Sequence, residues 1–162
     1  MHHGSVFKMV VATAALENNT ITTKTTVNDT GIYPRGHNPA CWIYTSRHYG
    51  HGYLNVTEAI KKSCNYFFYE LGYKMGIDPV IKYAKSYGLG IKTGIELSGE
   101  SKGIVDLKDY CKETTGQEWQ FGDTLSAVIG QSYNSYTPIQ IARYTSCLLY
   151  TSPSPRDRSV SR

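Results

Sequence analysis

The chain has 162 residues, a formal net charge of +4 at pH 7 and 40% hydrophobic residues, values that suit one ordinary globular domain. Its apolar runs are too short to cross a bilayer, and its basic residues form no clustered stripe of the kind that binds nucleic acid. We therefore expect a globular chain with no nucleic-acid partner.

The first third of the chain predicts one helix and little other regular structure. Residues 5–17 are apolar on nearly every side, which is typical of a helix buried in a larger protein. Residues 20–27 are rich in Thr and Ile and predict a short strand or an extended segment. Residues 31–52 show no period among their Gly, Pro, Tyr and His residues, so we expect an irregular loop.

Start and stop signals mark the helices of the remaining chain. Asn55 and Glu58 have the spacing of a capping box, which predicts a helix from there to about residue 62. Gly or Pro residues mark the borders of the later helices. These helices are expected over residues 65–75, 79–87 and 139–145. The fold class is therefore a mixed α/β (α+β) one with few strands.

Two short motifs indicate nucleophilic catalysis. Ser5 and Lys8 are three residues apart and share one face of a helix. A neutral lysine beside a serine can take the hydroxyl proton and make the oxygen a nucleophile. Ser63 and Asn65 can add a proton relay and an amide-binding group. The spacing of Ser5 and Lys8 alone is also explained by an exposed helix turn, so its context has to decide.

That context is a resemblance to class B penicillin-binding proteins of the elongation type, similar to penicillin-binding protein 2. Their transpeptidase domains carry the motifs Ser-x-x-Lys and Ser-x-Asn in this order. The resembling segments are Gly4–Glu17, Leu54–Gly72, Tyr87–Glu100, and Gly130–Gln131 with Thr137–Ala142. Four ordered segments spread over most of the chain make the resemblance specific to the N-terminal part of the transpeptidase domain.

The resemblance implies a peptidoglycan D,D-transpeptidase that cross-links stem peptides through an acyl-enzyme on Ser5. β-Lactam antibiotics would acylate the same serine. By the same resemblance Lys8 is the general base, Ser63 the relay that returns a proton to the leaving amine, and Asn65 the group that binds the substrate amide. No cofactor and no metal are implied.

The third motif of this family is a Lys-Thr-Gly triplet on a strand that lines the site. Residues 92–94 have these letters, but they precede the helix expected over 139–145, whereas the catalytic triplet follows it. They also lie in a stretch that resembles a structural segment of the family. We therefore expect Lys92 to be structural and the third motif to be absent from this chain.

The implied fold places helices around an antiparallel sheet, as in penicillin-binding proteins and serine β-lactamases. Most of its strands follow the helix at 139–145, so the later strands are expected to be missing here. One alternative function is a β-lactamase or β-lactam sensor, although the segments around Gly90 and Gly130 count against it. Another is a catalytically incomplete, non-enzymatic fragment, and we expect the chain taken by itself to be inactive.

The four cysteines form no Cys-x-x-Cys pair, which gives little support to a zinc or redox site. Each cysteine is expected to be a buried structural thiol. His48 and His51 have a spacing that suits a metal, but no further ligand pattern supports them.

Two further expectations concern the ends and the setting of the chain. Residues 147–162 resemble a translated sequencing adapter, which divides the chain into a partial transpeptidase domain, 1–146, and a non-native tail, 147–162. The resemblance also implies that the parent protein is anchored in the cell membrane with its catalytic domain outside the cytoplasm. Its partners would be those of the elongation machinery.

Overall fold

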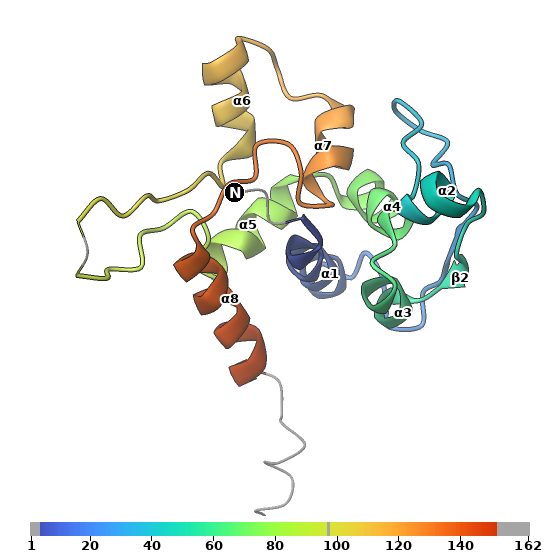
Figure 1. Cartoon of the computed structure of the whole chain (residues 1–162), viewed down its shortest axis with the longest axis horizontal. Coiled ribbons are helices and arrows are strands. Elements are labelled where there is room, and N and C mark those ends of the chain that lie inside the picture. Colours follow the sequence, from blue (N-terminus) through green and yellow to red (C-terminus); the bar gives the residue numbers. More distant parts are fainter. Residues whose placement is uncertain (1–3, 97, 152–162) are drawn as a thin grey trace, which may run out of the picture.

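The computed structural model describes residues 4–96 and 98–151 (Figure 1). The described elements are, in chain order, η1 (Gly4–Phe7), α1 (Lys8–Glu17), β1 (Val27–Asp29), α2 (Trp42–Arg47), β2 (Gly52–Leu54), α3 (Val56–Lys61), α4 (Asn65–Met75), α5 (Asp78–Ser86), α6 (Leu107–Thr115), α7 (Phe121–Ala127) and α8 (Pro138–Thr151). The described residues are mostly helical and contain one two-stranded antiparallel sheet, which confirms the expected fold class.

Helix α1 forms the centre of the core. Its alanines favour a helix, and their small side chains let neighbouring helices approach closely. Val10, Val11 and Ala14 have no exposed surface, and α1 packs against α4 and α5 (Figure 1). The 3-10 turn η1 precedes α1 directly, so Ser5 lies on the turn that enters a largely buried helix.

Helix α4 brings the Ser63–Asn65 segment to α1. Its first turn is capped by Cys64, whose Sγ accepts a hydrogen bond from the Phe67 N–H at 3.4 Å. Phe67, Phe68 and Leu71 are fully buried and hold α4 against the core. At Gly72 a Cβ atom would lie 3.0 Å from Val128, so glycine allows close packing at the end of α7.

The sheet consists of β1 and β2, paired antiparallel with Val27 opposite Leu54 and Asp29 opposite Gly52. Because β1 also contacts α4, Asp29 at its end faces the start of that helix. The sheet thereby holds a buried carboxylate next to the Ser63–Asn65 segment.

Several predicted elements are confirmed and others are wrong. The helix predicted over 65–75 and the capping box of Asn55 and Glu58 are both present. Of the short strand or extended segment predicted over 20–27, the strand is wrong and residues 20–26 form a loop: Thr25 Oγ1 accepts from the Thr22 N–H and closes a turn, so β1 begins only at residue 27.

The loop expected over 31–52 contains α2 and the start of β2. Helices α6 and α7 were not predicted. Helix α8 is longer than the predicted 139–145, and Leu148 in this extension packs against the core. Residues 147–151 of the expected tail thus continue α8, and residues 152–162 lie outside the described part of the chain.

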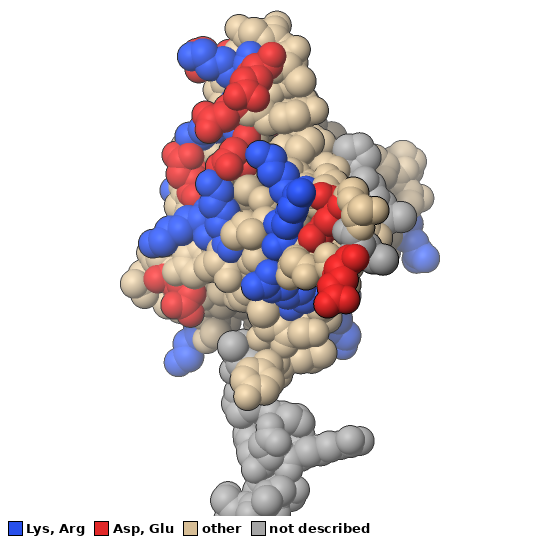
Figure 2. All heavy atoms as spheres, turned by 90° about the vertical axis from the view of Figure 1, so that its left-hand side faces the viewer, with Lys and Arg blue, Asp and Glu red and all other residues tan. Residues whose placement is uncertain are grey.

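Charged side chains of both signs mix on the face shown in Figure 2. Two salt bridges, Lys85–Asp106 and Lys108–Asp78, tie α5 to the start of α6. Among the described helices, none combines the length and the apolar character that crossing a membrane requires.

Candidate active site

The residues of the two short motifs meet although nearly sixty positions separate them in the chain. Ser5 Oγ lies 2.6 Å from Ser63 Oγ. Lys8 Nζ donates to Ser63 Oγ at 2.9 Å and to Asn65 Oδ1 at 2.6 Å. The same Nζ is 3.3 Å from Ser5 Oγ, so one ammonium group joins both hydroxyls.

Lys8 is 3% exposed, although lysine is rarely buried to this degree. Burial lowers its pKa to about 8, while the nearby thiol groups of Cys41 and Cys64 act in the opposite direction. The Phe68 ring lies 5.6 Å from Nζ and closes one side of the group. At neutral pH a measurable fraction of Lys8 is therefore uncharged and able to accept a proton.

The backbone at Ser63 has the left-handed conformation, with φ of 51°. This conformation is uncommon for a residue with a side chain and needs support from its surroundings. Lys8 Nζ supplies that support by donating to the Ser63 carbonyl at 2.8 Å. The buried lysine thus holds the backbone as well as the hydroxyl of Ser63.

Ser5, Ser63 and Asn65 open into a cavity of about 430 Å³. Sequence analysis missed three of its lining residues, Trp42, Ile129 and Gln131. Trp42 is fixed by an Nε1–H hydrogen bond to the Lys62 carbonyl at 3.1 Å. Trp42 lies in the stretch that was expected to be an irregular loop, so no local pattern marked it. Gln131 lies in the segment Gly130–Gln131, which resembles penicillin-binding proteins.

Gly130 shows why that segment approaches the nucleophile. Its φ is +79°, and a Cβ atom there would lie 2.0 Å from the carbonyl oxygen of Gly4. Only glycine allows this contact, which packs the turn after α7 against the turn that carries Ser5.

A second cluster of reactive side chains lies directly behind Ser63 and Asn65. The side chains of Asp29, Cys41, His51 and Cys64 each place a possible metal ligand within 4.8 Å of the others. The two sulfur atoms are 3.9 Å apart, and Cys41 Sγ is 3.6 Å from His51 Nδ1. Of the two histidines noted in the sequence, His51 belongs to this cluster, and its neighbours come from distant segments.

The distances from Cys41 to Cys64 and to His51 suit a tetrahedral metal site, whereas Asp29 Oδ2 lies closer to His51 Nδ1, at 2.7 Å, than two ligands of one such ion would. With zinc–sulfur bonds of about 2.3 Å and zinc–nitrogen bonds of about 2.05 Å, tetrahedral angles place two sulfurs roughly 3.8 Å apart and a sulfur and nitrogen roughly 3.6 Å apart. The observed distances of 3.9 Å and 3.6 Å agree with these values. We therefore designate the four residues the donor cluster, with a divalent ion such as zinc as the ligand that fits its sulfur and nitrogen atoms.

Hydrogen bonds join the members of the donor cluster. Asp29 Oδ2 is 2.7 Å from His51 Nδ1 and accepts from Cys64 Sγ at 3.2 Å. Burial raises the pKa of Asp29, but hydrogen bonds from His51, the two thiols and the Gly31 N–H outweigh it and leave the pKa below its ordinary value. The hydrogen bond between the thiols lowers the pKa of Cys41 and raises that of Cys64.

The triplet at residues 92–94 is held inside its own loop. Thr93 donates through its N–H and its hydroxyl to Glu100 Oε1, each at 2.6 Å, and the Gly94 N–H donates to Oε2 at 3.2 Å. This loop extends away from α1 in Figure 1. Lys92 is not among the residues that line the cavity at Ser5.

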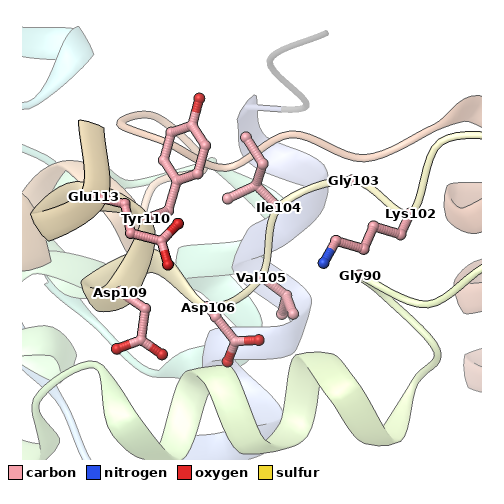
Figure 3. Close-up of a pocket in the computed structure, with 9 residues that line it drawn as sticks. All are labelled: Gly90, Lys102, Gly103, Ile104, Val105, Asp106, Asp109, Tyr110 and Glu113. Carbon is pink, nitrogen blue, oxygen red and sulfur yellow. The ribbon is translucent and has the colours of Figure 1, made fainter.

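Another cavity, of about 350 Å³, lies between α6 and the loop before it (Figure 3). Asp106, Asp109 and Glu113 line one side of it and Lys102 the other. An acidic cluster of this kind indicates no particular ligand. Ser5 and Lys8 are not among the residues that line it, so the reactive groups gather at the other cavity.

The family comparison gives this arrangement its context. Residues 1–151 match the penicillin binding protein transpeptidase domain. The chain belongs to the penicillin-binding protein transpeptidase family. It is 34% identical over 148 residues to the peptidoglycan D,D-transpeptidase MrdA of Haemophilus influenzae, a match that covers 90% of this chain and 22% of that relative.

Solved penicillin-binding proteins share the fold. The structure of Pseudomonas aeruginosa PBP2 in complex with WCK 5153 matches with a TM-score of 0.82 and 33% identity over 91% of this chain and 33% of the other. PBP2 of Helicobacter pylori, in complex with MreC, matches with a TM-score of 0.82 and 36% identity over 90% of this chain and 27% of the other. The chain thus spans about a fifth to a third of the length of these three relatives.

Proposed function

We propose that these residues form the nucleophile side of a peptidoglycan D,D-transpeptidase site, with Ser5 as the acyl-accepting residue. The observation that carries the proposal is the buried Lys8 amine, which lies within hydrogen-bond distance of the Ser5 and Ser63 hydroxyls. Covalent acyl transfer by a serine requires a nucleophile, a base of lowered pKa and a third group that is held in the right orientation.

In the proposed first step, Lys8 in its neutral form accepts the Ser5 proton while Oγ attacks the carbonyl carbon of a terminal D-Ala-D-Ala bond. Ser63 Oγ, 2.6 Å from Ser5 Oγ, then passes a proton to the nitrogen of the departing D-alanine. The C–N bond breaks, and the acyl group remains on Ser5. An amine from a second stem peptide attacks this ester, and the proton movements run in reverse.

Asn65 has two tasks in this proposal. Its Oδ1 accepts from Lys8 Nζ at 2.6 Å, which fixes the side-chain amide plane. Its NH₂ group is then directed to bind the carbonyl of the substrate amide. Trp42 and Ile129 provide apolar walls for the stem peptide beside it.

Neither β1 nor β2, the two described strands, contributes a residue to the lining of the cavity at Ser5, so no described strand supplies an oxyanion donor there. We propose that a strand with a Lys-Thr-Gly motif completes the site in the full-length protein, where it would also hold the substrate carboxylate. Loss of one oxyanion donor costs about 10²–10³ in rate, so the described part alone is proposed to be inactive.

The setting of the full-length protein is proposed from its relatives. These are peptidoglycan D,D-transpeptidases, and one solved relative is in complex with MreC. We infer a membrane-anchored protein whose catalytic domain works outside the cytoplasm with elongation-machinery partners. Its substrates are stem peptides, and β-lactams react as mimics of them.

The test uses the full-length protein that carries these residues, incubated with a chromogenic cephalosporin. A transpeptidase should give a burst of one opened β-lactam per protein and then almost no turnover, because the acyl-enzyme is stable to water. Continued rapid hydrolysis would favour the β-lactamase alternative. A folded full-length protein that gives neither a burst nor continued hydrolysis would contradict both enzyme assignments.

A further inference from the structure

We propose that Cys41 and Cys64 form a redox-active thiol pair that a small peroxide converts to a disulfide beside Ser63 and Asn65. The inference rests on the positions of the two sulfur atoms and is independent of the proposed transpeptidase reaction.

The sulfur atoms of the pair already face each other. They are 3.9 Å apart, and both residues are fully buried. Formation of a disulfide, with a bond of about 2.05 Å, requires the sulfurs to approach by roughly 2 Å. Each cysteine is the residue that immediately precedes a helix, α2 or α4, so side-chain rotation and small shifts of these two helix starts can supply the movement.

The chemistry needs only hydrogen peroxide as oxidant. The Cys41 sulfur attacks one peroxide oxygen as its thiol proton is released; the S–O bond forms, the O–O bond breaks, and the departing hydroxide takes up that proton to become water. The Cys64 sulfur then attacks the Cys41 sulfenic acid. The S–S bond forms, the S–O bond breaks, and the leaving hydroxide takes the Cys64 proton. Two thiols and one peroxide thus give one disulfide and two waters.

Oxidation changes what Cys64 does for the active site. Its Sγ now accepts from the Phe67 N–H and donates to Asp29, and its backbone joins Ser63 directly to Asn65. A bond to Cys41 takes the sulfur from Asp29 and links this segment to the residue before Trp42, at the edge of the cavity. The disulfide also removes two of the four members of the donor cluster, so metal binding and oxidation exclude each other.

Cys111 provides a control within the same chain. It is also buried, but its Sγ has the Thr115 hydroxyl and the Gln117 carbonyl as its hydrogen-bond partners, each at 3.8 Å. Neither of these partners is a sulfur atom. Peroxide should therefore leave Cys111 without a disulfide partner under conditions that link Cys41 to Cys64.

The test is a peptide map of the full-length protein that carries these residues. The protein is treated with a chelator, exposed to hydrogen peroxide, alkylated under denaturing conditions and digested with trypsin. Cys41 lies in the tryptic peptide 36–47, Cys64 in 63–74 and Cys111 in 109–112. We expect most of 63–74 to be recovered linked to 36–47, with 109–112 still alkylated.

Recovery of 36–47 and 63–74 as separate alkylated peptides, or as separate sulfinic acids, would overturn the proposal. The map needs no variant, so it does not depend on a substitution that fails to fold. As a second arm, Zn²⁺ added before peroxide should slow formation of the linked peptide by about tenfold or more, since bound thiolates are no longer free to react. An unchanged rate would refute the mutual exclusion of metal and disulfide.

Discussion

At the scale of single residues, the surroundings of Lys8 say most about the chemistry of the site. Its Nζ contacts both serine hydroxyls, the Ser63 carbonyl and Asn65 Oδ1, while solvent reaches almost none of the side chain. Burial favours the neutral amine, and the charge interactions with Cys41 and Cys64 favour the ammonium form. Burial is the larger effect, and the resulting pKa of about 8 suits a base that works near neutral pH.

This pKa predicts how acylation depends on pH. Lys8 gains its neutral form as pH rises, so the second-order rate of acylation by a β-lactam should increase through a pKa of about 8 and then level off. Stopped-flow measurement on the full-length protein gives the profile.

The matched variant is Lys8→Arg, which keeps a positive charge at every accessible pH and cannot serve as base. It should lose about 10²–10⁴ in rate, the range typical of a removed general base. A wild-type profile that is flat across this pH range, or an arginine variant within a few-fold of wild type, would contradict the assignment.

At the scale of elements, local signals predicted the helices that depend on local chemistry. The bounds of α4 and the capping box of α3 follow from Gly76 and from Asn55 with Glu58. Helix α2 was not predicted because its six residues lie in a segment whose apolar residues show no regular spacing. Strand β1 begins later than the predicted extended segment because a turn closed by Thr25 occupies the first part of that segment.

The active site was predictable only in part, because local sequence signals do not show which distant segments meet. Spacing pairs Ser5 with Lys8 and Ser63 with Asn65, but it contains no information on the contact between the two pairs; that expectation came from the resemblance. The donor cluster has no local signal at all. Its members come from β1, from two positions that flank α2 and from the start of α4, and only the packing of these elements brings the four side chains together.

The donor cluster predicts metal binding that links these elements. Adding Co²⁺ to the chelator-treated full-length protein should give near-ultraviolet absorption from sulfur-to-metal charge transfer, and Zn²⁺ should raise the midpoint of thermal unfolding because it binds the folded state. Cys64→Ser should weaken both effects strongly. Cys111→Ser, which alters a thiol outside the cluster, should leave both unchanged; absence of the absorption band in the wild-type protein would refute the site.

At the scale of the whole molecule, apolar surface next to the active site remains uncovered. An apolar hollow of about 380 Å³ runs beside Ser5 between α1 and α8, lined by side chains such as Met9, Ile60 and Tyr144. Val6 is 45% exposed and Leu149 71%. Contiguous apolar surface of this kind favours association with other molecules.

This surface predicts the behaviour of the 162-residue chain studied alone. It should be insoluble or should unfold without one cooperative transition, and penicillin should acylate it no faster than a Ser5→Ala control. Sedimentation, calorimetry and gel fluorescence with a labelled penicillin measure the three properties. A soluble chain with one sharp transition and stoichiometric labelling would show that the essential parts of the domain all lie within these residues.

The central claim is that Ser5 is the residue that receives the acyl group. The most direct measurement is the location of a penicillin adduct in the full-length protein by proteolysis and tandem mass spectrometry. We predict one penicilloyl group per protein, attached to Ser5 Oγ, and its complete loss in Ser5→Ala while Ser63→Ala retains slow labelling at Ser5. An adduct on Ser63 or on any other residue, or labelling that persists in a folded Ser5→Ala protein, would contradict the account.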